Sequence, residues 1–198
     1  MPVSRPEPVE IQASAMDNLR YIRQTMERAG SFTAVPGIGG VLMGTIAMLA
    51  AWAAGPSLGS ARWLTVWLAA AAVAVAVGAA GAAIKSRRAR LPLLSGPGRK
   101  FLAGFIPAML AGAVLTAALI SRGEATLLPA LWLLLYGAAV FSGGSASVRI
   151  VPLMGACFMA AGAVALLLPA TAETIALAAG FGGLHIVFGT IIAVKYGG

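Results

Sequence analysis

The chain has little charge for its length and almost none of the residues that most often build catalytic or metal centres. Only 10% of its 198 residues are charged, and it contains one cysteine and one histidine. A single cysteine excludes an intrachain disulfide and a cysteine cluster for a metal ion. A single histidine excludes haem ligation by two histidines and the two-histidine zinc motifs. The sequence also has no HExxH, P-loop or Cys-x-x-Cys motif.

Acidic residues are equally scarce. The six aspartates and glutamates lie almost entirely outside the apolar stretches, so hydrolysis by paired carboxylates has no set of residues to use. The formal net charge is +8, but the basic residues lie at the ends of apolar stretches, where membrane topology accounts for them. We therefore predict a protein without an enzymatic motif, without a metal site and without a nucleic-acid partner.

Most of the chain consists of long apolar runs. The chain is 60% hydrophobic with a mean hydropathy of +0.91, whereas soluble domains are about 45–50% apolar. Each run is close to the ~20 residues that cross a bilayer as a helix. The pattern predicts an all-α membrane bundle of six transmembrane helices. The expected spans are residues 36–54, 62–84, 101–120, 127–148, 150–168 and 174–194.

Residues 1–34 are expected to precede the membrane domain, residues 35–198, as a cytoplasmic segment. Within it, residues 9–29 repeat apolar residues at helical steps, which predicts an amphipathic helix. The apolar face consists of Ile11, Ala15, Leu19, Ile22 and Met26. Such a helix lies on the membrane surface or against the cytoplasmic ends of the bundle. Alternatively, it docks a protein partner.

Most of the 14 basic residues fall on one side of the predicted membrane. By the positive-inside rule both termini and the loop of residues 85–100 are cytoplasmic. The basic residues of this loop are expected to contact anionic lipid headgroups, or else to recruit an acidic partner. They are Lys85, Arg87, Arg88, Arg90, Arg99 and Lys100.

A short motif recurs in the first helix of each of three predicted hairpins. Met48, Met109 and Met159 are each followed, two residues later, by alanine and then a small residue, which is Gly112 in the second copy and Gly162 in the third. We interpret the chain as a triplicated two-helix unit. Small residues allow helices to approach closely in lipid, and methionine fills the gaps beside them. A methionine ring binding Cu(I) is the alternative.

His185 is the one strongly ionisable side chain well inside a predicted span, and it has no equivalent in the other two hairpins. It shares a small helix face with Ala178, Gly182, Gly189 and Ala193, which predicts packing against another helix or a flat ligand. Three roles remain open. A neutral imidazole hydrogen-bonds Tyr136, Thr116 or Ser142; the histidine senses protons or contacts a solute; or it ligates a haem or pigment metal.

The spacing Gly-x6-Gly-x6-Pro at Gly155, Gly162 and Pro169, within three hairpins, resembles the HdeD-like family of small six-helix bacterial membrane proteins. The resemblance covers residues 36–194. It implies a bacterial membrane protein linked to acid-stress resistance, without an obvious enzymatic motif. The location that we expect is the bacterial cytoplasmic (inner) membrane.

We carry three hypotheses about function. The first is a structural, regulatory or accessory membrane protein, with residues 9–29 and the Gly/Ala-rich helix faces available for a partner or for self-association. The second is a small transporter or channel that uses His185, Tyr136 and the polar segment beginning at Ser142. The third is a haem or pigment protein with His185 as its ligand.

Overall fold

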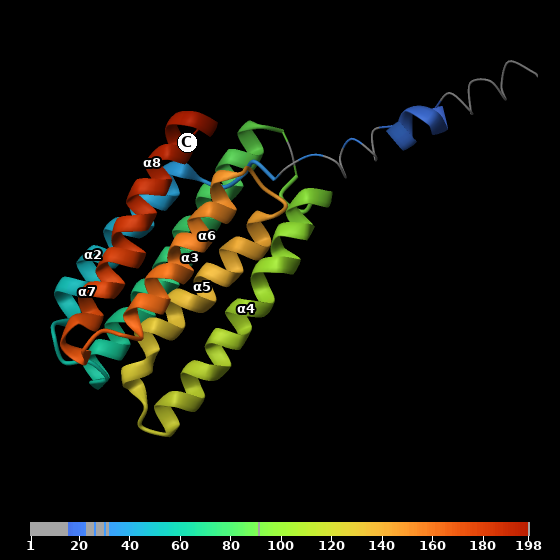
Figure 1. Ribbon diagram of the computed structural model, residues 1–198. Coiled ribbons are helices and arrows are strands. Elements are labelled where there is room, and N and C mark those ends of the chain that lie inside the picture. The colour runs from blue at the N-terminus through green and yellow to red at the C-terminus, as the bar shows by residue number, and fades with distance from the viewer. Residues whose placement is uncertain (1–15, 23–25, 27–29, 31, 91, 198) are drawn as a thin grey trace, which may run out of the picture.

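A computed structural model describes residues 16–22, 26, 30, 32–90 and 92–197, and this part of the chain is almost entirely helical (Figure 1). Seven helices make up the bundle. They are α2 (Gly37–Ala54), α3 (Ala61–Arg88), α4 (Gly96–Ser121), α5 (Leu128–Gly144), α6 (Ile150–Ala165), α7 (Glu173–Leu177) and α8 (His185–Tyr196). Short 3-10 turns precede α5 (η1, Ala125–Leu127) and α7 (η2, Ala170–Ala172), and a π-helical segment, η3 (Ala178–Leu184), joins α7 to α8.

Five helical stretches are long and apolar enough to cross a membrane. Four are α2, α3, α4 and the combination of η1 with α5. The fifth is the continuous helix Glu173–Tyr196, formed by α7, η3 and α8. The chain is therefore a helical, multi-pass integral membrane protein. The remaining helix, α6, is apolar but has only 16 residues, which at the α-helical rise extends about 24 Å. Six complete crossings stay a prediction.

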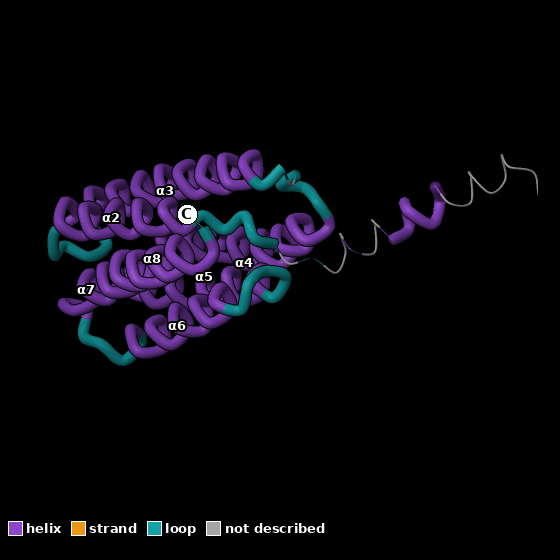
Figure 2. Tube along the Cα trace, turned by 90° about the horizontal axis from the view of Figure 1, so that it is seen from above, coloured by secondary structure: helices purple, strands orange, loops and turns teal. Residues whose placement is uncertain are grey.

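The helices pack in a defined order. α2 packs between α3 and α8, and α5 packs between α4 and α6. Seen from above, α3 and α6 lie at opposite edges of the bundle, with α2, α8 and α5 between them (Figure 2). The centre is filled by large buried side chains from α3, α5, α6 and α7, among them Trp63, Leu133, Phe158 and Leu177.

Glycines bring α2 and α8 into backbone contact. A Cβ atom on Gly189 of α8 would lie 2.6 Å from the backbone nitrogen of Val41. A Cβ on Gly40 of α2 would lie 3.1 Å from Cα of Gly189. Lipid tails provide no hydrophobic drive for helix association, so close backbone packing between small residues holds such an interface together. The predicted small face containing Gly182, His185 and Gly189 does pack against another helix, and that helix is α2.

The α5–α6 interface is built in the same way. A Cβ on Gly137 of α5 would lie 2.6 Å from the backbone nitrogen of Met159. A Cβ on Gly162 of α6 would lie 2.8 Å from the backbone nitrogen of Leu134. Both distances are shorter than real Cβ contacts, so these positions accept only glycine without a shift of the helices.

α3 and α4 differ from the other helices because, within the described residues, they have at most marginal contact with each other. α3 packs against α2, and α4 packs against α5. Each of the two helices buries only three of its residues. The bundle therefore has one side where two neighbouring hairpins do not close.

Two helices end earlier than expected. α5 ends at Gly144, not near residue 148, because the polar, Gly-rich run Ser142–Ser147 folds into a turn whose backbone amides bond the last carbonyls of the helix. α6 ends at Ala165, not at residue 168. Leu168 precedes Pro169, whose ring disfavours helical backbone at the residue before it.

The expected basic loop of residues 85–100 is mostly helix, which corrects the prediction. α3 continues to Arg88 and α4 begins at Gly96, so the connection spans only residues 89–95. Lysine and arginine are good helix formers and interact favourably with the C-terminal end of a helix. The end of the apolar run at Ile84 therefore does not end the helix.

The predicted amphipathic helix, residues 9–29, lies largely outside the described residues. Residues 16–22 are helical, and Leu19 and Ile22 on the predicted apolar face are exposed. The chain meets the bundle at Phe32, whose backbone nitrogen donates to the carbonyl of Ala146 at 2.7 Å. The hydroxyl of Ser147 donates to the carbonyl of Phe32, and the Phe32 ring lies 4.9 Å from that of Phe101.

Candidate functional site

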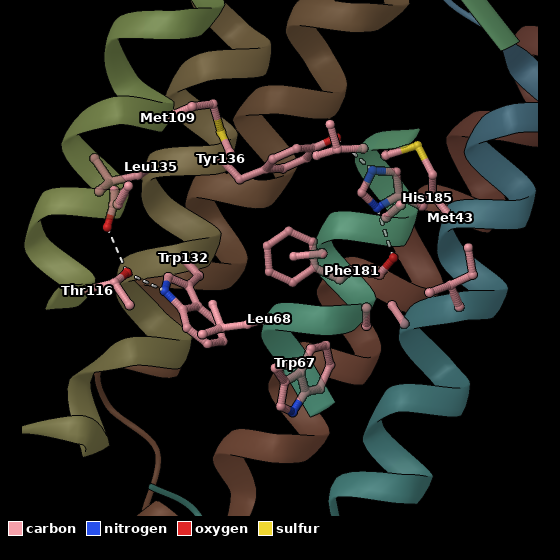
Figure 3. Close-up of a pocket in the computed structure, with 18 of the residues that line it drawn as sticks. Met43, Trp67, Leu68, Met109, Thr116, Trp132, Leu135, Tyr136, Phe181 and His185 are labelled. Atoms are coloured by element: carbon pink, nitrogen blue, oxygen red, sulfur yellow. Dashed lines mark hydrogen bonds between the residues drawn. The ribbon is translucent and has the colours of Figure 1, made fainter. Parts of the chain in front are cut away.

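A cavity of ≈ 330 Å³ lies where α3 and α4 stay apart. Its walls come from α2, α3, α4, α5, η3 and the first residue of α8, and almost all of the lining side chains are apolar. Figure 3 shows the lining residues, with Leu68 of α3 beside Trp132, Met109 of α4 beside Tyr136, and His185 hydrogen-bonded to Tyr136. Leu68 is 46% exposed. The apolar wall of the cavity is therefore half-exposed at Leu68, between two helices that are long enough to cross a membrane.

His185 and Tyr136 form the main polar feature of the cavity. The Tyr136 hydroxyl lies 2.7 Å from Nε2 of His185, and Nδ1 lies 2.8 Å from the backbone carbonyl oxygen of Phe181. A carbonyl oxygen only accepts, so Nδ1 carries the imidazole proton and Nε2 accepts the proton of the tyrosine. Tyr136 comes from α5 and His185 from α8, so this bond joins two halves of the bundle.

The local sequence explains how His185 reaches back to Phe181. The preceding segment, Ala178–Leu184, contains Gly180, Gly182 and Gly183 and forms a π-helix. Glycine lowers the cost of leaving regular α-helical geometry, and π-helical turns are frequent at functional sites. The wide turn lies directly before His185, whose imidazole then bonds to a carbonyl within its own helix.

Aromatic rings surround the imidazole. The centroid of the Phe158 ring lies 5.0 Å from that of His185, and the Phe181 ring stacks nearly parallel to it. Tyr136 meets both phenylalanines edge-on. The histidine is only 4% exposed, and a charged imidazole in such surroundings would be strongly disfavoured. The site therefore holds a neutral, doubly hydrogen-bonded imidazole.

A second polar pair lies toward the other end of the cavity. The indole nitrogen of Trp132 on α5 donates to Oγ1 of Thr116 on α4 at 2.8 Å, and the Thr116 hydroxyl donates to the carbonyl of Gly112 at 2.7 Å. Both bonds are drawn in Figure 3. This pair ties α4 to α5, on the side of α4 that is packed.

Not every sequence-predicted candidate reaches the cavity. Ser142 is exposed near the end of α5 and does not line it, so the predicted grouping of His185, Tyr136 and Ser142 is wrong for the serine. Thr116 bonds Trp132 instead of His185. The imidazole of His185 instead hydrogen-bonds Tyr136, which the sequence suggested, and the backbone carbonyl of Phe181.

The three motif methionines have different surroundings. A Cβ on Gly182 would collide with Met48, and a Cβ on Gly137 with Met159, so these two methionines lie in glycine-rich interfaces. Met109 lines the cavity. Their separate locations contradict a single methionine ring for Cu(I). Gly112, the small residue that follows Met109, meets only the Leu135 side chain at 3.6 Å.

Ligation of a haem or pigment by His185 would require one of its two hydrogen bonds to break, because both ring nitrogens are engaged. Within the described part of the chain, no group of three or more His, Cys, Asp or Glu side chains is placed to hold a metal ion.

The predicted headgroup-binding residues divide into two groups. Nζ of Lys85 donates to the backbone carbonyl of Val35 at 3.0 Å, so this ammonium holds the entry to α2. The other five predicted contacts, Arg87, Arg88, Arg90, Arg99 and Lys100, are exposed. They lie at the end of the bundle that also carries the C-terminus of α8 (Figure 1).

Sequence reasoning missed the cavity itself and one buried carboxyl group. Small residues at helical spacing on α3, such as Ala70 and Ala74, opposite Gly112 on α4, are the signal that could have found the cavity. Glu173, the first residue of α7, is buried, and its Oε2 atom has no hydrogen-bond partner. It lies beside Thr174, which accepts a hydrogen bond from the indole of Trp63.

Comparison of the chain with protein-family models, with curated proteins and with solved structures returned no match. The resemblance to the HdeD-like family therefore stays a prediction that rests on the residues that suggested it.

Proposed function

We propose that this chain is a non-enzymatic membrane protein that takes up a small apolar molecule from the bilayer into the cavity between α3 and α4. The observation that carries the proposal is the cavity itself. It has an apolar lining, a half-exposed wall at Leu68 and one buried histidine–tyrosine pair. Ligand sites are typically concave and apolar, with a few polar groups that set orientation.

Binding of a molecule in the cavity would provide a physical basis for the regulatory or accessory role expected from the sequence. Occupancy would change the spacing of α3 and α4, whose connection, residues 89–95, lies between exposed basic residues at one end of the bundle. By the positive-inside rule we place this end and both termini in the cytoplasm, where the basic residues meet anionic lipid or an acidic partner. We propose the bacterial inner membrane as the location and α6 as a sixth crossing.

A transport role for His185 has less support. The imidazole is neutral and doubly bonded, and its surroundings are rings of phenylalanine and tyrosine. Coupling to an ion requires polar or charged groups along a pathway. Binding of a neutral apolar molecule requires no such polar or charged groups, and the cavity provides the space for it.

Native mass spectrometry of the purified protein with added decane tests the proposal. We expect the wild type to retain decane and a Gly112→Leu variant to lose it, because Gly112 lines the cavity and a larger side chain there takes up its space. Ala111→Leu is the matched control. It adds the same side chain one position earlier on α4, at an exposed residue that does not line the cavity.

The two variants should have the helical circular dichroism of the wild type, which establishes that loss of decane is not loss of fold. Equal retention of decane by the wild type and Gly112→Leu would overturn the proposal, as would a wild type that retains neither decane nor an oxygen-containing compound of the same chain length.

A further inference from the structure

Two polar pairs at the cavity wall direct all of their side-chain protons to partners inside the protein. The Nδ1 proton of His185 goes to the carbonyl of Phe181, and the Tyr136 proton goes to Nε2 of His185. The carbonyl of Phe181 can only accept a hydrogen bond, so Nδ1 must carry the imidazole proton and Nε2 must accept the proton of Tyr136. Tyr136 has one proton, so its oxygen faces any further partner only as an acceptor.

The second polar pair has the same arrangement. The Trp132 N–H goes to Oγ1 of Thr116, and the Thr116 proton goes to the carbonyl of Gly112. The threonine oxygen has accepted one bond and has a lone pair left. The indole N–H of Trp67 has no partner, but its nitrogen is fully covered and does not reach the cavity surface.

We propose that the cavity selects an apolar molecule that carries a hydroxyl group, an alcohol or phenol, over ketones, ethers and hydrocarbons of the same size. The inference rests on the proposed function, since it names the class of molecule that the cavity takes. A hydroxyl donates to the oxygen of Tyr136 or Thr116 without disturbing either existing bond. A ligand that can only accept finds no free proton and has to break the Tyr136–His185 bond.

Competition among three matched probes tests this preference. Native mass spectrometry measures retention of 1-decanol, decyl methyl ether and decane by the wild-type protein. One added hydrogen bond predicts that decanol binds roughly three- to tenfold more tightly than the ether. The ether should not exceed decane, because it finds no donor.

Changes at His185 make the test specific to the proton arrangement. In His185→Leu the Tyr136 proton loses its acceptor and turns to the cavity, so the ether should gain over decane and the advantage of decanol over the ether should shrink. In His185→Gln the amide oxygen can accept the tyrosine proton, so the wild-type order should be kept. A structural role for the histidine alone would not move the ranking of ligands.

The outcomes separate the two proposals. If none of the probes is retained, the proposed function fails. If decane, ether and decanol are retained equally, or if the ether binds most tightly, the cavity is real and the preference for a hydroxyl is wrong. The wild-type ranking decides the matter even where a variant does not fold.

Discussion

Two places in the bundle join one predicted hairpin to the next: the α5–α6 interface and the space between α3 and α4. The helices pack closely at the first and leave a cavity at the second. In the first, Gly137 and Gly162 bring backbones so close that a single methyl group would collide. In the second, a methyl group on Gly112 would make only ordinary contact with the Leu135 side chain, and Gly112 helps to line a cavity of ≈ 330 Å³. Gly162 and Gly112 hold the same place in the repeated motif. A small residue therefore permits close packing in lipid but does not by itself produce it.

The difference lies in the facing helix. At the α5–α6 interface, Gly137 and Gly162 each lie directly against backbone atoms of the facing helix. α3 lines the cavity with Trp67 and Leu68 as well as with alanines, and a methyl group on Gly112 of α4 would meet only the Leu135 side chain of α5. The closed interface is therefore the one in which glycines lie against the backbone of the facing helix, and Gly112 has no such backbone neighbour.

The largest expected effect comes from forcing open the α2–α8 interface. Gly189→Leu adds a side chain whose Cβ atom would lie 2.6 Å from the backbone nitrogen of Val41 and 2.9 Å from the carbonyl oxygen of Gly37. We expect a loss of about 3 kcal/mol in the free energy of unfolding. Unfolding by SDS in mixed micelles, followed by circular dichroism, measures it. Gly112→Leu should stay close to the wild type, and an equal loss in both variants would erase the contrast between closed and open junctions.

Two leucines compare the closed core with the cavity wall. Leu133 of α5 is fully buried, whereas Leu68 of α3 is half-exposed beside the cavity. We expect Leu133→Ala to destabilise by about 2–3 kcal/mol through lost packing, and Leu68→Ala by less than about 1 kcal/mol. The same unfolding assay compares them. A larger loss at Leu68 would mean that α3 is packed more tightly than its contacts indicate.

A methyl group at the two equivalent motif glycines gives a finer comparison. Gly162→Ala meets the backbone of Leu134 and should cost about 1–2 kcal/mol. Gly112→Ala makes only an ordinary contact with Leu135 and should be neutral, or stabilising by about 0.5 kcal/mol through better helix propensity. Thermal unfolding of the purified variants should therefore shift in opposite directions or in one variant only. Equal shifts would contradict the assignment of an open and a closed junction.

The smallest expected effect tests the tie that holds α4 on α5. Thr116→Val leaves the indole N–H of Trp132 without its acceptor and should cost about 1 kcal/mol. Thr65→Val is the control, because Thr65 bonds only the carbonyl of Ala61 in its own helix. Equal effects of the two substitutions in the unfolding assay would show that the Trp132 bond does not hold α4.

The sequence predicted the membrane helices because hydrophobic length is a strong physical signal, and it placed the start of α2 within one residue of Gly37. It also predicted that the His185 face packs on a helix and that Tyr136 is a possible partner. The early end of α5 at Gly144 depends on a turn whose geometry a hydropathy pattern does not contain.

The cavity could not be predicted, because it depends on which helices are neighbours. Gly112 and Gly162 look equivalent in the sequence, and only the facing residues distinguish them. The tautomer of His185 is likewise determined by the carbonyl of Phe181, which becomes available through a π-helical turn. The three glycines of that turn are visible in the sequence, but its π-helical geometry is not.

The α2–α8 interface joins the first membrane helix of the bundle to the last one. Because a ribosome makes the chain from its N-terminus, the glycine face of α2 enters the bilayer before any of its partner residues on α8 exists. It must remain against lipid, or against proteins of the insertion machinery, until the roughly 130 residues between Ala54 and His185 have been made. Assembly of this bundle is therefore completed only by its final helix, and a chain that stops before α8 exposes the face of α2 that the finished protein hides.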